Sequence, residues 1–381
     1  MTQDIKLFIP GPCDIDEDVL EAMSHPVRRS YGATWLPIYN ETLNLLKQVF
    51  QTRNDLFIVP GPGSAGLDMA LGSLLANGEK VIVPHNGFFG ERLAFIAECN
   101  GLSAVRISTP EGQPLDPDHL RRALAAHPDA SLVALVHHET TTTVLNPLKE
   151  LAAATREAGR LLLVDAVSSL GGAELPVDAW GIDVCVTASN KCLETPPGLA
   201  IISVSPKAWE MVGRHTRTNH GWYLDLRTWR WYAEKWGNWH PAPITMPTNT
   251  ILALHTSLQR IFKVGLPAHI AKHTRACRTI RAGLRKLGFE LLVPDEFAAP
   301  TATAVRLRPE FTAAELIQWL EAERGVCITG GIGELAGKIF RVGHLGKATT
   351  DEYLAYFLAA LREFLLHKGI QAADVSSEIP G

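Results

Sequence analysis

Residues 187–198 read Thr-Ala-Ser-Asn-Lys-Cys-Leu-Glu-Thr-Pro-Pro-Gly, a mostly polar stretch between two apolar runs. The preceding run, Ile182 to Val186, and the following run, Leu199 to Val204, are rich in valine and isoleucine and predict two buried strands. Lys191 is therefore expected in the turn between these strands. A solvated loop lysine is a sufficient explanation for this stretch alone, so the role of Lys191 depends on the segments around it.

The surrounding chain continues this pattern, because short apolar runs alternate with segments of helical length from residue 56 onward. Continuous apolar strands separated by crossover helices are typical of an α/β fold, with a mostly parallel sheet covered on both faces. Seven strands are predicted, at 56–59, 80–84, 103–107, 131–136, 161–165, 183–187 and 199–204. Helices are predicted at 16–24, 38–51, 64–76, 88–99, 117–126 and 146–158.

Ligands of such sheets bind at the carboxyl ends of the strands, where Asp165 ends the run 161–165. A buried carboxylate without a partner takes up a proton, because burial disfavours its charged form. Asp165 therefore requires a nearby cation. Lys191 is one candidate, and the protonated ring nitrogen of a cofactor is the other.

Two further strand ends carry sequences suited to a ligand. Pro60 to Asp68 is a glycine-rich turn that leads into a helix, and its free amides with the Ser64 hydroxyl form a candidate anion site. Phe88 and Phe89, which Gly87 and Gly90 flank, follow the predicted strand 80–84. These two rings either cap a planar ligand or pack in the core.

Two polar segments each allow two interpretations. His137, His138 and Glu139 follow a strand and suggest a metal site, but neighbouring residues of an extended chain point to opposite faces, so no metal is expected there. The segment Arg28 to Trp35 is either a solvated connector or a loop at the mouth of a substrate site. On the second interpretation Trp35 is a substrate-binding residue.

The composition excludes several classes of protein. The 381 residues are 46% hydrophobic, and they are expected to form one large and one smaller domain. A net charge of -4 and a pI near 6.4 disfavour nucleic acid and anionic membranes as partners. The six cysteines form no Cys-x-x-Cys pair, and no apolar run approaches the ~20 residues of a membrane span. A cytoplasmic location is expected.

The motifs described above belong to a series that extends through nearly the whole chain. The chain resembles the class V aminotransferases, particularly the alanine/serine-glyoxylate branch, with features of 2-aminoethylphosphonate-pyruvate and pyridoxamine-pyruvate transaminases. Seven motifs in the same order are more specific than any one of them. They are Pro10-Gly11-Pro12, Gly61-Pro62-Gly63-Ser64, Asn86-Gly87-Phe88-Phe89-Gly90, His138-Glu139-Thr140-Thr141, Val164-Asp165-Ala166-Val167-Ser168-Ser169, Ser189-Asn190-Lys191-Cys192 and Phe340-Arg341-Val342-Gly343.

The resemblance implies the type I fold of pyridoxal-phosphate-dependent transferases, with pyridoxal 5′-phosphate as cofactor and no metal. Lys191 would hold the cofactor as a Schiff base and shuttle the proton, and Asp165 would keep the ring nitrogen protonated. Arg341 matches the arginine whose planar fork binds the substrate carboxylate. The cofactor-binding residues implied are Gly63, Ser64, Ala65, Phe89, Thr140, Asp165, Val167, Asn190, Lys191, Thr245 and Thr248.

The segment 236–248 has features of more than one branch. Members of the family place a residue from this segment on the phosphate of the other subunit, which implies a homodimer. The Thr-x-Pro-Thr at 245–248 is similar to the 2-aminoethylphosphonate enzymes, whereas the His-x-x-Pro at 240–243 is similar to the alanine/serine-glyoxylate enzymes. Asn238 and Trp239 stand where the latter often carry a tyrosine.

The implied activity is ping-pong transfer of an amino group from a small amino acid, alanine or serine, to a 2-oxo acid such as glyoxylate or pyruvate. The alternatives are the other two transaminase activities, a lyase of cysteine-desulfurase type and a non-catalytic homologue. The lyase chemistry requires a cysteine on a mobile loop, which neither Cys192 nor Cys327 provides. A non-catalytic homologue would lack Lys191, Asp165 or Arg341.

The expected domains are an N-terminal arm (1–16), a large cofactor-binding domain (17–260) and a small C-terminal α+β domain (261–381). Helices at 266–287, 312–323 and 350–366 and strands at 289–293, 301–307, 325–329 and 338–342 are predicted in the small domain.

Overall fold

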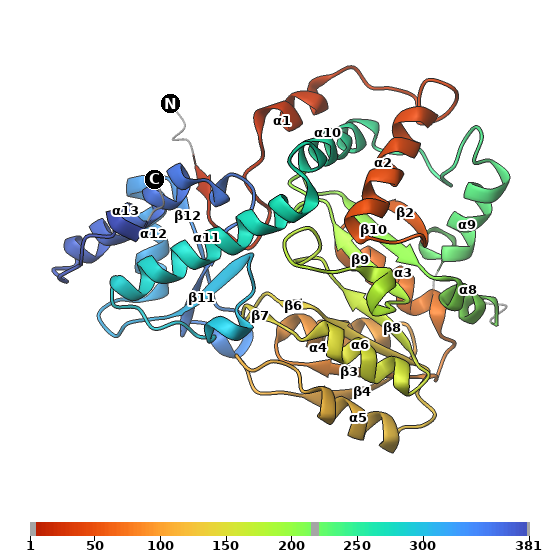
Figure 1. Cartoon of the computed structure of the whole chain (residues 1–381), viewed down its shortest axis with the longest axis horizontal. Helices are drawn as coiled ribbons and strands as arrows, with labels where there is room; N and C mark the ends of the chain where they lie inside the picture. The colour runs from red at the N-terminus through yellow and green to blue at the C-terminus, as the bar shows by residue number, and fades with distance from the viewer. Residues whose placement is uncertain (1–4, 215–220, 379–381) are drawn as a thin grey trace.

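The computed structural model describes residues 5–214 and 221–378 and contains a seven-stranded sheet (Figure 1). Its strand order is β2-β10-β9-β8-β5-β3-β4, and β10 runs in the direction opposite to the other six strands. All seven predicted strands are confirmed to within one residue at either end. They are β2 (Asp55–Pro60), β3 (Lys80–His85), β4 (Ser103–Ser108), β5 (Leu132–Val136), β8 (Leu161–Asp165), β9 (Val184–Ala188) and β10 (Leu199–Val204).

Helices cover this sheet and bury its central strands. Strands β5, β8, β9 and β10 are buried at every residue, which explains why their sequences are continuously apolar. Helix α3 packs against β9 and β10, α4 against β3, β4 and β5, and α6 against β8. The predicted helices are found as α1 (Glu17–Ser24), α2 (Leu36–Phe50), α3 (Gly63–Leu74), α4 (Phe88–Cys99), α5 (Pro117–Ala126) and α6 (Leu148–Glu157).

The part of the chain before Gly265 also contains helices that the sequence pattern did not predict. They are α7 (Val177–Trp180), α8 (Pro206–Gly213), α9 (Leu226–Lys235) and α10 (Thr248–Val264). Helix α10 packs against α1 and α2, which lie more than 190 positions earlier in the chain. Burial of an amphipathic face stabilises such a helix more than local propensity does. No helix in the described parts of the chain is long and apolar enough to cross a lipid bilayer.

The C-terminal part of the chain, whose ribbon is cyan to blue in Figure 1, has its own hydrophobic core. Its sheet has the order β11-β14-β13. Gly265 separates α10 from α11, and we propose it as the domain boundary. The predicted strand 289–293 is wrong, because that segment forms only an isolated bridge between Leu291 and Val305. The elements are α11 (Leu266–Lys286), β11 (Ala302–Arg306), α12 (Ala313–Arg324), β12 (Val326–Cys327), β13 (Thr329–Gly330), β14 (Ile339–Gly343) and α13 (Asp351–His367).

The N-terminal arm links the two parts. Strand β1 (Lys6–Leu7) pairs in parallel with β12, and Phe8 lies in the core of the small domain. The amide of Gly343 donates a hydrogen bond of 2.7 Å to the Phe8 carbonyl oxygen. The remaining short elements are β6 (His138–Glu139), β7 (Val144–Leu145), η1 (Trp222–Leu224), η2 (Asp295–Phe297), η3 (Gly333–Leu335), η4 (Lys347–Thr349) and η5 (Ser376–Glu378).

Candidate active site

A cavity of about 190 Å³, which we call the active-site cavity, lies where strands β5, β8 and β9 end. Both Asp165 and Lys191 line it, although 26 residues separate them in the chain. The structure also brings to it six of the other predicted residues, and it adds three polar residues that were not predicted to bind cofactor or substrate. The predicted residues are Gly63, Ser64, Phe89, Thr140, Val167 and Asn190, and the additional ones are Arg92, His138 and Ser168.

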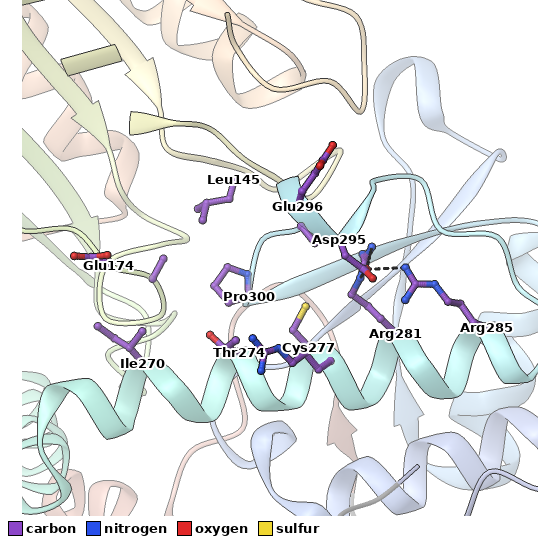
Figure 2. A pocket seen from close by; sticks show the side chains of 13 residues that line it. Leu145, Glu174, Ile270, Thr274, Cys277, Arg281, Arg285, Asp295, Glu296 and Pro300 are labelled. Atoms are coloured by element: carbon purple, nitrogen blue, oxygen red, sulfur yellow. Dashed lines mark hydrogen bonds and ion pairs between the residues drawn. The ribbon is translucent and has the colours of Figure 1, made fainter. Parts of the chain in front are cut away.

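A larger cavity of about 780 Å³ runs along α11 and is shown in Figure 2. Its best-defined polar groups already pair with one another, since Arg281 and Arg285 both contact an Asp295 oxygen at 2.6 Å. Neither Lys191 nor Asp165 lines this cavity. The smaller cavity is therefore the better candidate, because it contains a lysine and a carboxylate without such a partner.

The N-terminal arm closes over the Lys191 side chain. The Lys191 ammonium donates a hydrogen bond to the carbonyl oxygen of Pro10. A β-carbon built on Gly11 would lie 2.5 Å from Lys191 Nζ, so glycine is required for this close approach. Burial lowers the pKa of Lys191 to about 8. The motifs 10–12 and 189–192 are therefore in direct contact. The Lys191 amine loses its proton more readily than that of a surface lysine.

The turn that carries Lys191 is fixed from behind by α11. Lys272 pairs with the Glu194 carboxylate at 2.6 Å, and His269 Nε2 hydrogen bonds the Cys192 carbonyl oxygen at 2.9 Å. Glu194 has a φ of 50°, a left-handed conformation that is rare outside glycine. Its amide donates a hydrogen bond of 3.0 Å to the Lys191 carbonyl oxygen. These contacts hold the turn in one conformation.

Asp165 ends β8 and faces the active-site cavity. Its Oδ1 accepts a hydrogen bond of 2.9 Å from the Val167 amide. Burial raises the pKa of its carboxyl group, while the charges of Arg92 and Lys191 act in the opposite direction. Across residues 5–214 and 221–378, no ion pair joins Asp165 to Lys191. The carboxylate is therefore available to a cation from a ligand, such as a protonated ring nitrogen.

Phe89 is held in place by a buried carboxylate. Glu139 Oε2 accepts hydrogen bonds of 3.1 Å from the amides of Phe89 and Gly90, at the first turn of α4. Its other oxygen accepts from the amide and hydroxyl of Thr141. A carboxylate at a helix N-terminus is favoured by the helix dipole. Arg92 lies 4.4 Å from the ring centre of Phe89. The ring thus has a fixed position at the cavity.

The start of α3 provides the candidate anion site. Gly63 lies so close to Val167 that an added β-carbon would be 2.6 Å from the valine side chain. The backbone amides at a helix N-terminus attract anions, and Gly63 and Ser64 both line the cavity. Ala65 does not line it, and its amide donates instead to the Pro62 carbonyl oxygen at 2.8 Å.

Arg341, on β14, lies beside the cavity rather than in its lining. Its Nη1 donates to the Thr140 carbonyl oxygen at 3.1 Å, and its Nε donates to the Gly330 carbonyl oxygen at 3.0 Å. Thr140 itself lines the cavity and donates from its hydroxyl to Ser168 Oγ at 2.8 Å. The guanidinium is thereby oriented by two backbone groups, with Nη2 not needed for either bond.

Besides Ala65 and Arg341, three predicted residues do not line this cavity. Trp35 is 1% exposed and packs in the large hydrophobic core beside Tyr39. Thr248 starts α10 and donates from its hydroxyl to the Arg28 carbonyl oxygen at 3.1 Å. Thr245 is exposed. Trp35 therefore has a packing role within the chain, whereas Thr245 presents its side chain at the surface.

The two adjacent histidines have separate partners, as their backbone positions predict. His137 Nδ1 contacts Ser169 Oγ at 3.0 Å, and His138 Nδ1 contacts the Ser168 carbonyl oxygen at 3.0 Å. His138 lines the active-site cavity. The sequence signal for His138 was its position shortly after a buried strand. Only the structure shows that His137 and His138 have different partners.

The comparisons with known proteins agree with this geometry. The model of the family described as aminotransferase class-V matches residues 6–342. Alanine-glyoxylate aminotransferase of Oryctolagus cuniculus is 32% identical, with 95% of this chain and 92% of the relative covered. The chain belongs to the class V aminotransferase family.

Two solved structures resemble the whole chain. Ureidoglycine-glyoxylate aminotransferase from Bacillus subtilis is 30% identical with a TM-score of 0.94, covering 100% of this chain and 98% of that one. Pyridoxamine-pyruvate aminotransferase from Mesorhizobium loti is 28% identical with a TM-score of 0.92, covering 99% and 96%. The protein is accordingly an aminotransferase with the fold of these enzymes.

Proposed function

We propose that the protein binds pyridoxal 5′-phosphate and transfers the amino group of a small amino acid, of the alanine or serine class, to glyoxylate or pyruvate by a ping-pong mechanism. The observation that supports this most is the meeting of Lys191 and Asp165 at one cavity, where the carboxylate has no ion pair with the lysine. Relatives named for glyoxylate and pyruvate as acceptors support the substrate class.

The donor set fits the cofactor. We assign Asp165 to the ring nitrogen, Phe89 and Val167 to the ring faces, and the α3 amides of Gly63 and Ser64 to the phosphate. When bound, pyridoxal phosphate supplies an electron sink for the charge that develops on the substrate α-carbon. We assign Thr140 and Asn190 to the polar edge of the cofactor. Thr245 and Thr248 are assigned to the phosphate of the cofactor bound in the partner subunit. Ala65 contributes only through the helix start.

We assign to Lys191 the transfer of the proton from the substrate α-carbon. Burial lowers the pKa of Lys191 to about 8, so about a tenth of the amine is neutral at pH 7 and can accept a proton, a far larger share than for a surface lysine. Pro10 holds the amine through its carbonyl oxygen. We assign to Arg341 the binding of the substrate carboxylate. Its planar fork orients the substrate so that the hydrogen on the α-carbon faces Lys191.

The alternatives make different demands on the site. A lyase of cysteine-desulfurase type needs a reactive thiolate, but burial raises the pKa of Cys192 to about 12. Cys327 lies on β12, which pairs with the N-terminal strand. Both thiols are therefore poorly suited to that chemistry. The 2-aminoethylphosphonate and pyridoxamine activities remain candidates, since each uses the same lysine and aspartate.

Six unpaired cysteines suit a reducing compartment, and we propose the cytoplasm.

The donor is identified by half-reactions. The cofactor-loaded protein is mixed separately with alanine, serine, 2-aminoethylphosphonate and pyridoxamine, and the loss of its visible absorbance is followed. We expect alanine or serine to remove the absorbance at least 10-fold faster than the other two, a difference of about 1.4 kcal/mol. Rapid loss with only pyridoxamine or only 2-aminoethylphosphonate would assign the protein to that branch instead.

The contact between the arm and the lysine gives a prediction of its own. Gly11→Ala is expected to weaken cofactor binding about 10-fold, because a side chain at φ +110° is strained and would displace Lys191. Gly78→Ala is the matched control, since Gly78 has a φ of +84° and nothing within 4 Å of an added β-carbon. The measurement is an absorbance titration with cofactor. Equal affinities for the two variants would mean that the arm does not position the lysine.

We also propose a homodimer formed through an aromatic surface that consists of Trp222, Trp231, Trp236 and Trp239. These indoles are 41–55% exposed, and the ring centre of Trp236 lies 5.8 Å from that of Trp231 and 5.7 Å from that of Trp239. Trp222 joins the cluster through Tyr232, whose ring centre lies 6.3 Å from that of Trp222 and 5.0 Å from that of Trp231. An exposed cluster of tryptophans is typical of interface hot spots. Trp236 and Trp239 belong to the segment 236–248, from which the family resemblance places a residue on the partner's phosphate.

The double variant Trp236→Ser/Trp239→Ser is expected to raise the dimer dissociation constant about 100-fold or more, because hot-spot tryptophans contribute roughly 2 kcal/mol or more each. Light scattering over a dilution series measures it. Leu366→Ser, at an exposed position of α13, is the control and should leave the dissociation constant unchanged. A double variant as dimeric as the parent would rule out this surface as the interface.

A further inference from the structure

His138 has one ring nitrogen anchored and the other without a partner. Its Nδ1 lies 3.0 Å from the Ser168 carbonyl oxygen and 2.8 Å from Thr301 Oγ1. Its Nε2 is buried and has no hydrogen-bond partner in the described parts of the chain. The side chain is 2% exposed and lines the active-site cavity. The imidazole is therefore a fixed polar group that nothing in the assigned site uses.

The contacts determine which nitrogen carries the proton. The Thr301 hydroxyl donates its own proton to the Ser168 carbonyl oxygen at 3.0 Å, so both groups next to Nδ1 are acceptors for it. Nδ1 must then carry the hydrogen. Burial lowers the pKa of His138 to about 4, so the ring is neutral and Nε2 has a free lone pair. Nε2 is consequently an acceptor.

A buried acceptor without a donor destabilises the protein, so a ligand that supplies a donor binds more tightly than one that does not. The position of His138 indicates which ligand does so. His138 lines the same cavity as Lys191 and Thr140, and Arg341 Nη1 donates to the Thr140 carbonyl oxygen at 3.1 Å. His138 is thus close to the residue assigned to the α-carbon and to the residue assigned to the carboxylate.

We propose that His138 Nε2 accepts a hydrogen bond from the side chain of the amino donor. This selects small amino acids whose β-position carries an O–H or N–H group, as in serine or a ureido-substituted glycine, over alanine. The inference rests on the proposed function and specifies its substrate class. A site that contains a buried acceptor discriminates against the analogue without the donor, because the acceptor is then left unpaired.

The first experiment compares serine with alanine in the half-reaction of the cofactor-loaded enzyme. We expect kcat/KM for serine to exceed that for alanine by about 10-fold or more, because alanine leaves the buried acceptor unpaired. In His138→Phe the ratio should fall to about one. In His138→Gln, whose amide oxygen can reach the position of Nε2, part of the preference should return. Thermal unfolding checks that both variants fold.

The second experiment does not depend on transamination. Binding of 3-hydroxypropionate and propionate, which have no amino group, is measured calorimetrically with the loaded parent enzyme and with His138→Phe. We expect the hydroxy acid to bind more tightly only to the parent. If neither amino acid reacts, the proposed function fails, while this measurement still tests the role of His138.

Two outcomes would overturn the inference. One is an unchanged serine-to-alanine ratio in both variants together with equal binding of the two acids to parent and variant. The other is a change confined to the cofactor, in which His138→Phe shifts the pH dependence of the visible absorbance but leaves the substrate ratio and the acid binding as in the parent. In that case Nε2 would accept from the cofactor.

Discussion

Lys191→Ala is expected to lose the visible absorbance of the bound cofactor and to slow the half-reaction by about 10³-fold or more. The variant removes both the amine that we assign to hold the cofactor and the group that we assign to move the proton, and proton transfer alone contributes roughly 10²–10⁴-fold. Stopped-flow absorbance with the best amino donor measures the rate. Cofactor content after gel filtration measures retention.

The control for this variant is Lys207→Ala, at an exposed lysine that follows β10 and donates a hydrogen bond to the Arg160 carbonyl oxygen. It should match the parent in both measurements. A small primary amine such as methylamine, added to Lys191→Ala, should restore part of the rate, because it can enter the space that the side chain vacates. A variant that retains the half-reaction within 10-fold of the parent would refute the assignment of Lys191.

Arg341→Lys is expected to lower kcat/KM for alanine or serine by about 100-fold. Lysine keeps the charge but lacks the planar fork, so it cannot hold both carboxylate oxygens, and each charged hydrogen bond is worth roughly 1.5–3 kcal/mol. Lysine also cannot keep the bonds to Thr140 and Gly330 while it contacts substrate. Both KM and kcat should change, because orientation and binding depend on the same fork.

The matched control is Arg306→Lys, on the neighbouring strand β11, where the guanidinium is exposed and pairs with Glu290. Its kcat/KM should equal that of the parent. The effect of Arg341→Lys also tests the substrate class, because pyridoxamine has no carboxylate. A normal rate with alanine or serine in Arg341→Lys would show that another group binds the carboxylate.

The sequence predicted the features of the fold that depend on a few neighbouring residues. The strands β8, β9 and β10 were predictable because burial on both faces requires unbroken apolar runs. The placement of Asp165 and Lys191 in one cavity followed from the rule that strand ends meet at one edge of a parallel sheet. Helix α10 was not predictable, because its stability comes from packing against the distant helices α1 and α2.

Side-chain orientation was beyond the sequence. Trp35 was expected at a substrate mouth from its polar and glycine-containing neighbours, yet the structure packs it in the core beside Tyr39. The buried carboxylate of Glu139 fixes Phe89 from a segment 50 residues later in the chain. Neither contact has a signature in spacing or composition, since each depends on which faces of separate elements meet.

The sequence by itself determined the α/β sheet, the lysine and aspartate at its strand ends and the membership of the class V aminotransferases. Only the tertiary structure decided that Pro10 and Gly11 close over Lys191, that Arg341 is oriented by the Thr140 carbonyl oxygen, and that His138 keeps a free nitrogen. The reason is physical. Periodicity and apolar runs encode burial, which acts locally along the chain, whereas hydrogen-bond partners are fixed by distances between segments that only packing brings together.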